Sequence, residues 1–149
     1  IRDRFSKGLE TLQLRMDVHS QRAQALAEWL ETHPDVRKVN YCGLASHPDH
    51  ALAASQQSAF GGVLSFEVEG GRDTAWAFIN AVRLMSLAAN LGDVKTTVCH
   101  PASTTHGRLT DVQKQQGSIT EGLIRIAVGL EDLEDLKRDC ERGFAAISA

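Results

Sequence analysis

The sequence predicts an α+β fold, a two-layer α/β sandwich in which helices cover one face of a mostly antiparallel sheet, preceded by a long helix. Two patterns carry this prediction. Apolar residues recur at three- and four-residue steps in residues 9–30, 75–85 and 133–147, as they do on amphipathic helices. Residues 63–69 instead alternate apolar and polar side chains, which is typical of a strand with one wet face.

Size and charge are those of one ordinary globular domain. A chain of 149 residues can bury about two-thirds of its unfolded surface. The net charge of −3 provides no basic surface for nucleic acid, and no apolar run is long enough to cross a membrane. Three cysteines without paired spacing indicate free thiols in a reducing compartment. We therefore expect a cytoplasmic protein with neither nucleic acid nor membrane as partner, and the missing initiator Met favours a fragment.

The first half of the chain begins with the long helix, in residues 1–32. This helix ends at His33-Pro34, because the residue before a proline is disfavoured in the α region. Its apolar stripe is long for a small domain, so we expect part of it to pack against something outside this chain. A strand at 36–41 and a short helix at 48–57 follow. Glycine pairs then bound the alternating strand at 63–69.

The second half continues the alternation of helices and strands. Asp73 is predicted to be the N-cap of a helix, and residues 95–99 are β-prone. Residues 110–116 are predicted to form a helical turn, and residues 123–128 a strand. The terminal helix at 131–147 has acidic residues at its start and basic residues later, an order that suits the helix dipole.

Arg125 is the first candidate for function, because a cation inside an apolar strand needs a partner. It shares a strand face with Leu123 and with Ala127, whose small side chain leaves room for a ligand. A guanidinium binds a carboxylate with two parallel hydrogen bonds. That carboxylate belongs either to the terminal helix, as Glu131 or Glu134, or to a ligand, and the spacing alone leaves both possibilities open.

Two polar stretches are further candidates. Residues 90–93 (Asn-Leu-Gly-Asp) are typical of a helix C-cap and turn, with the alternative that Asn90 presents its amide to an anion. Residues 99–106 carry Cys, His and Thr side chains, but their spacing fits no usual metal site, and a Cys/His pair has no third residue to orient the base. We predict no metal, and interpret 99–106 as a loop that positions hydroxyls over a ligand or hydrogen-bonds to itself.

Five blocks occur in the order and spacing of a known family, at residues 8–16, 61–66, 90–93, 100–106 and 123–132. They resemble the C-terminal part of the Cys/Met-metabolism enzymes that use pyridoxal phosphate, which include cystathionine γ-synthase, methionine γ-lyase and the homoserine-ester sulfhydrylases. Asn-Leu-Gly-Asp followed by Lys-Thr-Thr, and Thr-Thr-His-Gly-Arg-Leu, most resemble the branch that makes homocysteine from O-succinylhomoserine and sulfide. The resemblance covers essentially the whole chain.

The resemblance implies the small C-terminal domain of a fold-type I pyridoxal-phosphate enzyme, in residues 33–149. Residues 1–32 would then link it to a missing N-terminal cofactor domain. The resemblance also implies that Arg125 grips the substrate α-carboxylate, that Asn90 contacts the same group, and that Thr105 lies in the loop beside it. The implied partners are a homoserine ester, bound through its carboxylate, and further copies of the chain in a homotetramer.

The chain departs from the family in one important respect. The family's Schiff-base lysine and its cofactor-binding residues belong to the N-terminal domain, so we predict no catalytic residue here and no activity for this fragment alone. Pyridoxal phosphate is expected only in the full-length enzyme. All the lysines of this chain stand near polar or charged residues and are predicted to be solvated: Lys7, Lys38, Lys95, Lys114 and Lys137.

Several alternatives remain open at this point. Within the family, they are cystathionine γ-synthase, O-acetylhomoserine sulfhydrylase and methionine γ-lyase. Outside it, they are a non-catalytic amino-acid-binding module and an oligomerisation module that uses the helix stripe. If the carboxylate-binding prediction holds, we expect Arg125 to face a water-filled cleft and to have no partner on the terminal helix.

Overall fold

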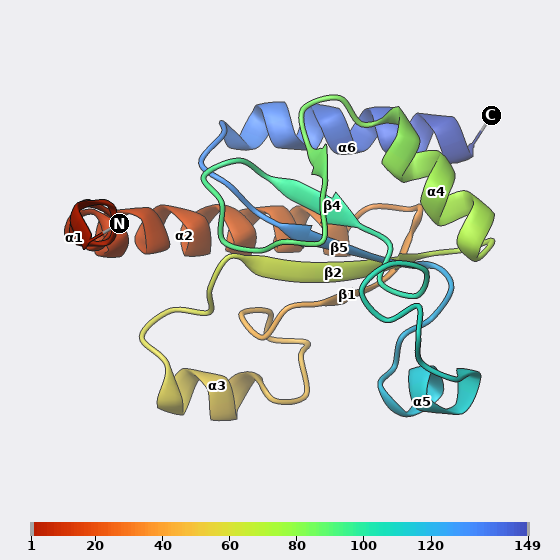
Figure 1. Ribbon diagram of the computed structural model, residues 1–149. Coiled ribbons are helices and arrows are strands. Elements are labelled where there is room, and N and C mark those ends of the chain that lie inside the picture. Colours follow the sequence, from red (N-terminus) through yellow and green to blue (C-terminus); the bar gives the residue numbers. More distant parts are fainter. Residues whose placement is uncertain (1, 149) are drawn as a thin grey trace.

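A five-stranded sheet forms the centre of the structure, a computed structural model that describes residues 2–148. The strand order is β1-β2-β5-β4-β3, and every neighbouring pair is antiparallel except β3 and β4 (Figure 1). The predicted mostly antiparallel sheet is therefore confirmed. The strands are β1 (Val36–Asn40), β2 (Val63–Val68), β3 (Ser86–Leu87), β4 (Thr97–Cys99) and β5 (Leu123–Ala127).

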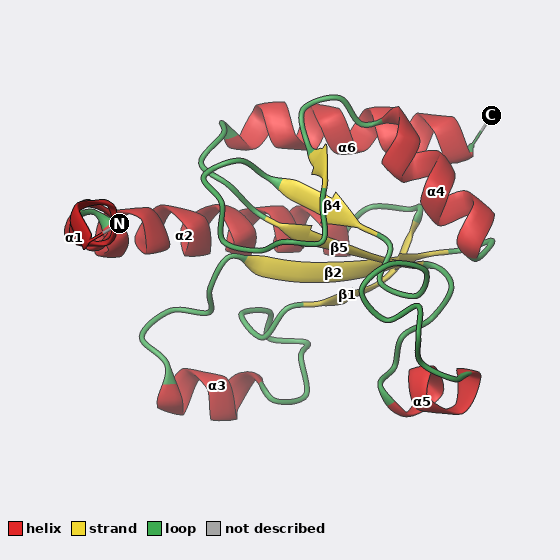
Figure 2. Ribbon diagram, viewed as in Figure 1, coloured by secondary structure: helices red, strands yellow, loops and turns green. Residues whose placement is uncertain are grey.

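Three of the helices pack on one face of this sheet. Helices α2, α4 and α6 contribute buried apolar residues to a single core with β2 and β5, whereas α3 and α5 lie on the opposite side (Figures 1 and 2). The two-layer arrangement is therefore confirmed. The helices are α1 (Arg2–Glu10), α2 (Leu12–Glu31), α3 (His50–Gln56), α4 (Arg72–Ala81), α5 (Asp111–Gln116) and α6 (Leu133–Ile147).

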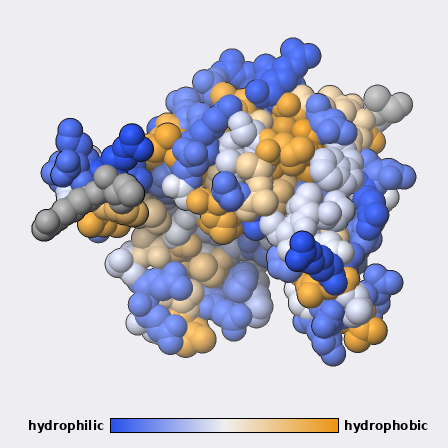
Figure 3. Space-filling view, viewed as in Figure 1, coloured by the Kyte–Doolittle hydropathy of each residue, from blue (hydrophilic) through white to orange (hydrophobic). Residues whose placement is uncertain are grey.

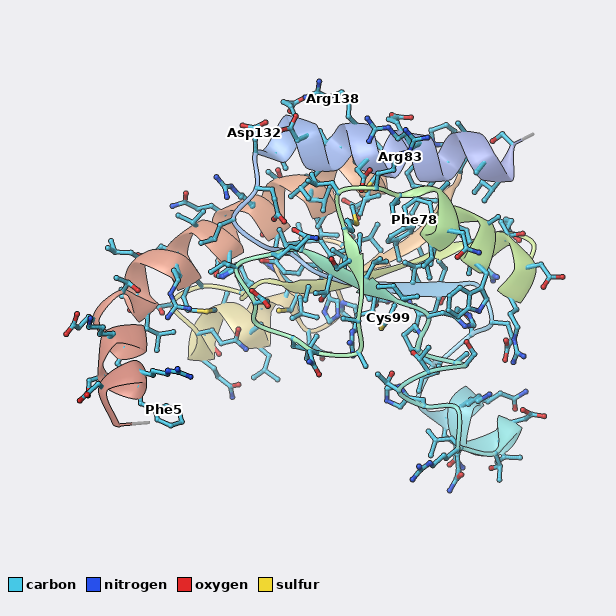
Figure 4. The ribbon with its side chains drawn as sticks, turned by 45° about the horizontal axis from the view of Figure 1, so that its top comes forward. Phe5, Phe78, Arg83, Cys99, Asp132 and Arg138 are labelled. Carbon is cyan, nitrogen blue, oxygen red and sulfur yellow. The ribbon has the colours of Figure 1, made fainter. Side chains whose placement is uncertain are left out.

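Aromatic rings join the two layers of the core. Phe66 of β2 contacts Phe78 of α4 with 5.4 Å between ring centroids, and Phe78 contacts Phe144 of α6 at 5.0 Å. Figure 4 shows Phe78 pointing into the interior beneath α6. Ile124 and Ile126 of β5 are fully buried on this same core. Because side chains alternate along a strand, Arg125 between them must point to the other face of the sheet.

The predicted single N-terminal helix is two helices, with a break at Thr11 between α1 and α2. The second half of α2 packs into the core through Ala23, Leu26 and Leu30. The first half and α1 extend beyond the body of the domain and expose several large apolar side chains (Figures 3 and 4). The unusually long apolar stripe therefore has an uncovered end, and its exposed side chains are Phe5, Leu9, Leu12, Leu14 and Met16.

Two predictions about helix ends are wrong. Asp73 lies in the first turn of α4, while the N-cap is Gly71, whose φ of 76° favours glycine. Helix α4 ends at Ala81, so residues 90–93 are not its C-cap but part of the loop between β3 and β4. Strand β3 was not predicted because it has only two residues, too few to show a periodic pattern.

The outer face of the sheet is less exposed to solvent than the alternating pattern of residues 63–69 predicts. Glu67 of β2 is only 8% exposed, and it lines a pocket together with residues of α5 and the loop after it. Lys114 of α5 is likewise 9% exposed, which corrects the prediction that every lysine is solvated. Among residues 2–148, no helix is long and apolar enough to cross a membrane.

Candidate functional site

Arg125 lies at the middle of β5, between two strands that flank it on the outer face of the sheet. Its register partners are Ser65 of β2 on one side and Cys99 of β4 on the other. The arginine is half-buried. Cys99, labelled in Figure 4 on β4, is buried, and this burial raises the pKa of its thiol although the nearby Arg125 charge acts in the opposite direction.

The guanidinium of Arg125 has a neutral partner rather than a charged one. Its Nη2 donates to the carbonyl oxygen of Ala89 at 2.8 Å, and no ion pair joins it to a carboxylate within the described part of the chain. Glu131 instead accepts hydrogen bonds from Thr96, and Glu134 pairs with Lys137 at 2.7 Å. The alternative in which Arg125 forms a structural ion pair with a carboxylate of the terminal helix is therefore wrong.

The remaining donors of Arg125 are available to an anion. A guanidinium carries five N–H donors in a fixed planar arrangement, and a single carbonyl uses only part of that capacity. A half-buried cation without a countercharge is unfavourable unless a ligand or another part of the protein supplies the charge. The site is thus suited to a carboxylate. The expected water-filled cleft stays a prediction, because its other wall would come from outside this chain.

Asn90 is brought next to Arg125 through Ala89, its neighbour in the chain. The hydroxyl of Thr97 donates to the carbonyl oxygen of Asn90 at 3.1 Å, and the Ala88 N–H donates to Val98 at 3.1 Å. These bonds hold the backbone of the loop beside β4. The Asn90 side chain is exposed, at a hollow lined by Arg15 and residues 90–94.

Thr105 is not brought to the same place by any contact. It is exposed, and its hydroxyl forms a 2.8 Å hydrogen bond with Nδ1 of His106. Among the described residues it bonds to neither Arg125 nor Asn90. The loop also satisfies itself at His100, which is fully buried, with Nδ1 2.7 Å from the Ser103 hydroxyl and Nε2 2.8 Å from a backbone carbonyl. The observed contacts of this loop therefore agree with the alternative that residues 99–106 hydrogen-bond mainly among themselves.

The residues of this chain do not form a complete binding site for pyridoxal phosphate. A Schiff-base lysine needs a site that favours its neutral form, yet the two least exposed lysine side chains face carboxylates. Lys114 lies 3.7 Å from Glu121, and Lys137 lies 2.7 Å from Glu134. The other three lysines are exposed. No cluster of potential metal ligands occurs in residues 2–148.

Sequence reasoning missed the group that organises the loop at this site. Thr96 is fully buried and bonds to Glu131 through both its N–H and its hydroxyl, at 2.8 and 2.7 Å. The sequence indicates Glu131 only as a possible partner of Arg125. No sequence signal distinguishes the two partners, because the choice depends on how β4 and β5 pair.

Fold and site together define a small α+β domain with a half-buried arginine on the outer face of its sheet, and this arginine has no carboxylate partner among the described residues. The chain belongs to the Cys/Met metabolism PLP-dependent enzymes, whose family model matches residues 4–145. The predicted family is therefore confirmed, and membership favours an enzyme over the two non-catalytic alternatives. Its fold is that of the small C-terminal domain of such enzymes.

Three similar proteins are each much longer than this chain. It is 59% identical over 143 residues to O-succinylhomoserine sulfhydrylase from Pseudomonas aeruginosa, covering 96% of this chain and 36% of that protein. It is 44% identical over 140 residues to L-methionine gamma-lyase from Pseudomonas putida, covering 94% and 35%. The crystal structure of cystathionine gamma synthase from Xanthomonas oryzae pv. oryzae, in complex with cystathionine, matches with a TM-score of 0.90 and 43% identity, covering 95% and 37%. The chain thus spans about a third of the length of its relatives.

Proposed function

We propose that this chain is the substrate-carboxylate domain of a pyridoxal-phosphate enzyme that makes homocysteine from O-succinylhomoserine and sulfide. The observation that carries the proposal is Arg125, a half-buried guanidinium held by Ala89 and lacking an ion pair among the described residues. The 59% identity to a protein of that name supports the choice of substrate. The cofactor would supply the bond-breaking chemistry from the rest of the enzyme.

In this proposal, residues of this chain bind and orient the substrate. Arg125 pairs with the α-carboxylate, and this pairing fixes the direction of the reacting carbons relative to the cofactor. Asn90, adjacent to the Arg125 contact, donates to the same carboxylate. Thr105 is assigned to the rim of the site, where its hydroxyl, which bonds to Nδ1 of His106 in this structure, is exposed toward a longer part of the substrate.

We also infer that residues 1–32 lead into a cofactor domain that lies outside this chain, while residues 33–149 form the substrate-carboxylate domain. Support comes from the exposed apolar side chains of α1 and the first half of α2, which include Phe5 at 70% and Leu9 at 67% exposed. Apolar surface of this kind is characteristic of a contact with another domain or chain. We assign the full-length protein to a homotetramer in the cytoplasm.

Replacing Arg125 by alanine in the full-length enzyme tests the proposal. We expect kcat/KM for O-succinylhomoserine to fall by an amount equivalent to about 2–5 kcal/mol, the usual cost of removing one partner of a desolvated charge pair. The matched control is Arg138→Ala, which removes an exposed arginine that pairs with Asp135 on α6. An unchanged kcat/KM in the Arg125 variant would refute the assignment.

The same assay separates the members of the family. The wild-type enzyme should be compared with the succinyl and acetyl esters of homoserine, each with sulfide and with cysteine as the nucleophile. Faster turnover of the succinyl ester with sulfide supports the proposal. Preference for cysteine would instead indicate a cystathionine γ-synthase, and elimination from methionine would indicate a methionine γ-lyase.

A further inference from the structure

The loop between β3 and β4 carries the two residues, Ala89 and Asn90, that lie beside Arg125 at the proposed carboxylate site. Ala89 provides the carbonyl that accepts from Arg125, and Asn90 follows it directly. Residues 89–95 are all exposed. An exposed loop has little burial to fix its conformation, so its position depends on a few hydrogen bonds to the rest of the domain.

Glu131 holds the loop through both of its carboxylate oxygens. One carboxylate oxygen accepts from the Thr96 backbone N–H at 2.8 Å, and the other accepts from the Thr96 hydroxyl at 2.7 Å. That hydroxyl in turn accepts from the Gly129 N–H at 2.8 Å. Thr96 is fully buried, so no water can replace a lost partner of its N–H or its hydroxyl.

The backbone at the end of β5 packs directly against the loop. Leu130 N–H donates to the Val94 carbonyl at 2.7 Å. A side-chain carbon on Gly129 would collide with backbone atoms of Val94 and Thr96 and with the Glu131 carboxylate. Only glycine permits this close approach, which places Glu131 where both of its oxygens reach Thr96.

Hydrogen bonds and peptide links between sequence neighbours together connect Glu131 to the proposed site. Thr96 precedes Thr97, whose hydroxyl holds the Asn90 carbonyl, and Ala89 beside it accepts from Arg125. The direction of the Arg125 guanidinium and the position of Asn90 therefore both depend on how this loop is held. Displacement of such groups by a fraction of an ångström is enough to weaken recognition of a substrate.

We propose that Glu131 is a positioning residue for the substrate carboxylate, acting through Thr96 on the loop that carries Ala89 and Asn90. This inference rests on the proposed function. Glu131 acts as a hydrogen-bond acceptor in a fixed geometry, with one carboxylate oxygen on each Thr96 donor. Glutamine has the same shape and keeps the acceptor for the Thr96 N–H. Its amide nitrogen would face the Thr96 hydroxyl, whose proton would then lack an acceptor, so glutamine should replace glutamate only in part.

The test uses the full-length enzyme with Glu131→Ala, Glu131→Gln and, as matched control, Glu134→Ala, which removes an exposed carboxylate three residues further along. Steady-state kinetics with O-succinylhomoserine and sulfide measure KM and kcat separately. Hydrogen–deuterium exchange with mass spectrometry measures the protection of residues 86–97. Thermal unfolding checks that each variant is folded.

In Glu131→Ala we expect KM to rise by about tenfold, as for the loss of about one net hydrogen bond, with a smaller change in kcat. Exchange at residues 90–97 should accelerate in the same variant. Glu134→Ala should resemble the wild type in both measurements, and Glu131→Gln should be intermediate. If Glu131→Ala keeps the KM of the wild type, or if Glu134→Ala is impaired as strongly as Glu131→Ala, the positioning role is wrong.

The two proposals fail in different ways. A wild-type enzyme that does not convert homoserine esters, or an Arg125→Ala variant with unchanged kcat/KM, would refute the proposed function. An unchanged exchange rate at residues 90–97 in Glu131→Ala would refute the positioning role even in an active enzyme. Because exchange does not depend on turnover, it decides the structural part of the inference on its own.

Discussion

Removal of the buried carboxylate of Asp139 should destabilise this domain more than removal of any exposed carboxylate on the same helix. Asp139 of α6 is fully buried, and its oxygens accept from the backbone N–H groups of Arg83, Leu84 and Met85 at 2.8, 2.9 and 3.1 Å. Arg142 adds a charged partner at 3.0 Å. These bonds hold the chain where it leaves α4 and enters β3.

The magnitude follows from how many of these donors water could reach. Met85 is 5% exposed and Leu84 is only partly exposed, whereas Arg83 is exposed and could bond to water. Each buried donor left unpaired costs about 1–3 kcal/mol, so with Leu84 and Met85 unpaired Asp139→Ala should lower the free energy of unfolding by about 2–6 kcal/mol. Asp139→Asn keeps one acceptor oxygen but turns an amide N–H toward a donor, so we expect an intermediate loss.

Urea unfolding of the chain, followed by circular dichroism, measures these free energies. The matched control is Asp135→Ala, which removes an exposed carboxylate on the same helix that pairs with Arg138. Exposed pairs contribute about 0–1 kcal/mol, so the control should stay near the wild type. If Asp139→Ala lost no more stability than Asp135→Ala, the reasoning from unpaired donors would be refuted.

Two further predictions concern ionisation and reactivity. Burial raises the pKa of Tyr41, the one tyrosine of the chain, to about 12, so its ultraviolet absorbance should titrate near that value in the folded protein and at about pH 10 in the unfolded protein. The stability associated with the neutral phenol is complete below about pH 10 and is lost as the pH rises to about 12. A titration of the folded protein at about pH 10 would contradict this prediction. Burial also raises the pKa of the fully buried Cys140 thiol. Iodoacetamide at mildly alkaline pH should therefore label the half-buried Cys42 first, and Cys140 only after unfolding. Equal labelling rates of the two thiols, measured by mass spectrometry, would contradict the described packing.

Local patterns predicted most of the secondary structure. The alternation in residues 63–69 and the helical spacing in residues 133–147 correspond to β2 and α6, because each pattern reports which side chains face the core. The ordered motifs identified the family. Boundaries were less predictable where only a few residues or one backbone angle decided them, as at Thr11, Gly71 and strand β3.

Burial on the second face of the sheet was not predictable from the pattern of one strand. Glu67 has the polar character of an exposed position, and it is buried because α5 and its following loop lie over that end of the sheet. Lys114 is buried for the same reason and pairs with Glu121. Periodicity describes a residue's position within its own element, whereas exposure depends on what other elements cover.

The sequence by itself determined the class of fold, the family and the presence of an unusual arginine in strand β5. Only the tertiary structure decided its partners. Glu131 bonds to Thr96, 35 positions away, and Arg125 bonds to Ala89, 36 positions away, because β4 pairs with β5 and brings the β3–β4 loop to both. A carboxylate and a guanidinium can pair in many ways, and hydrogen-bond geometry selects one of them only after the strands have set the distances.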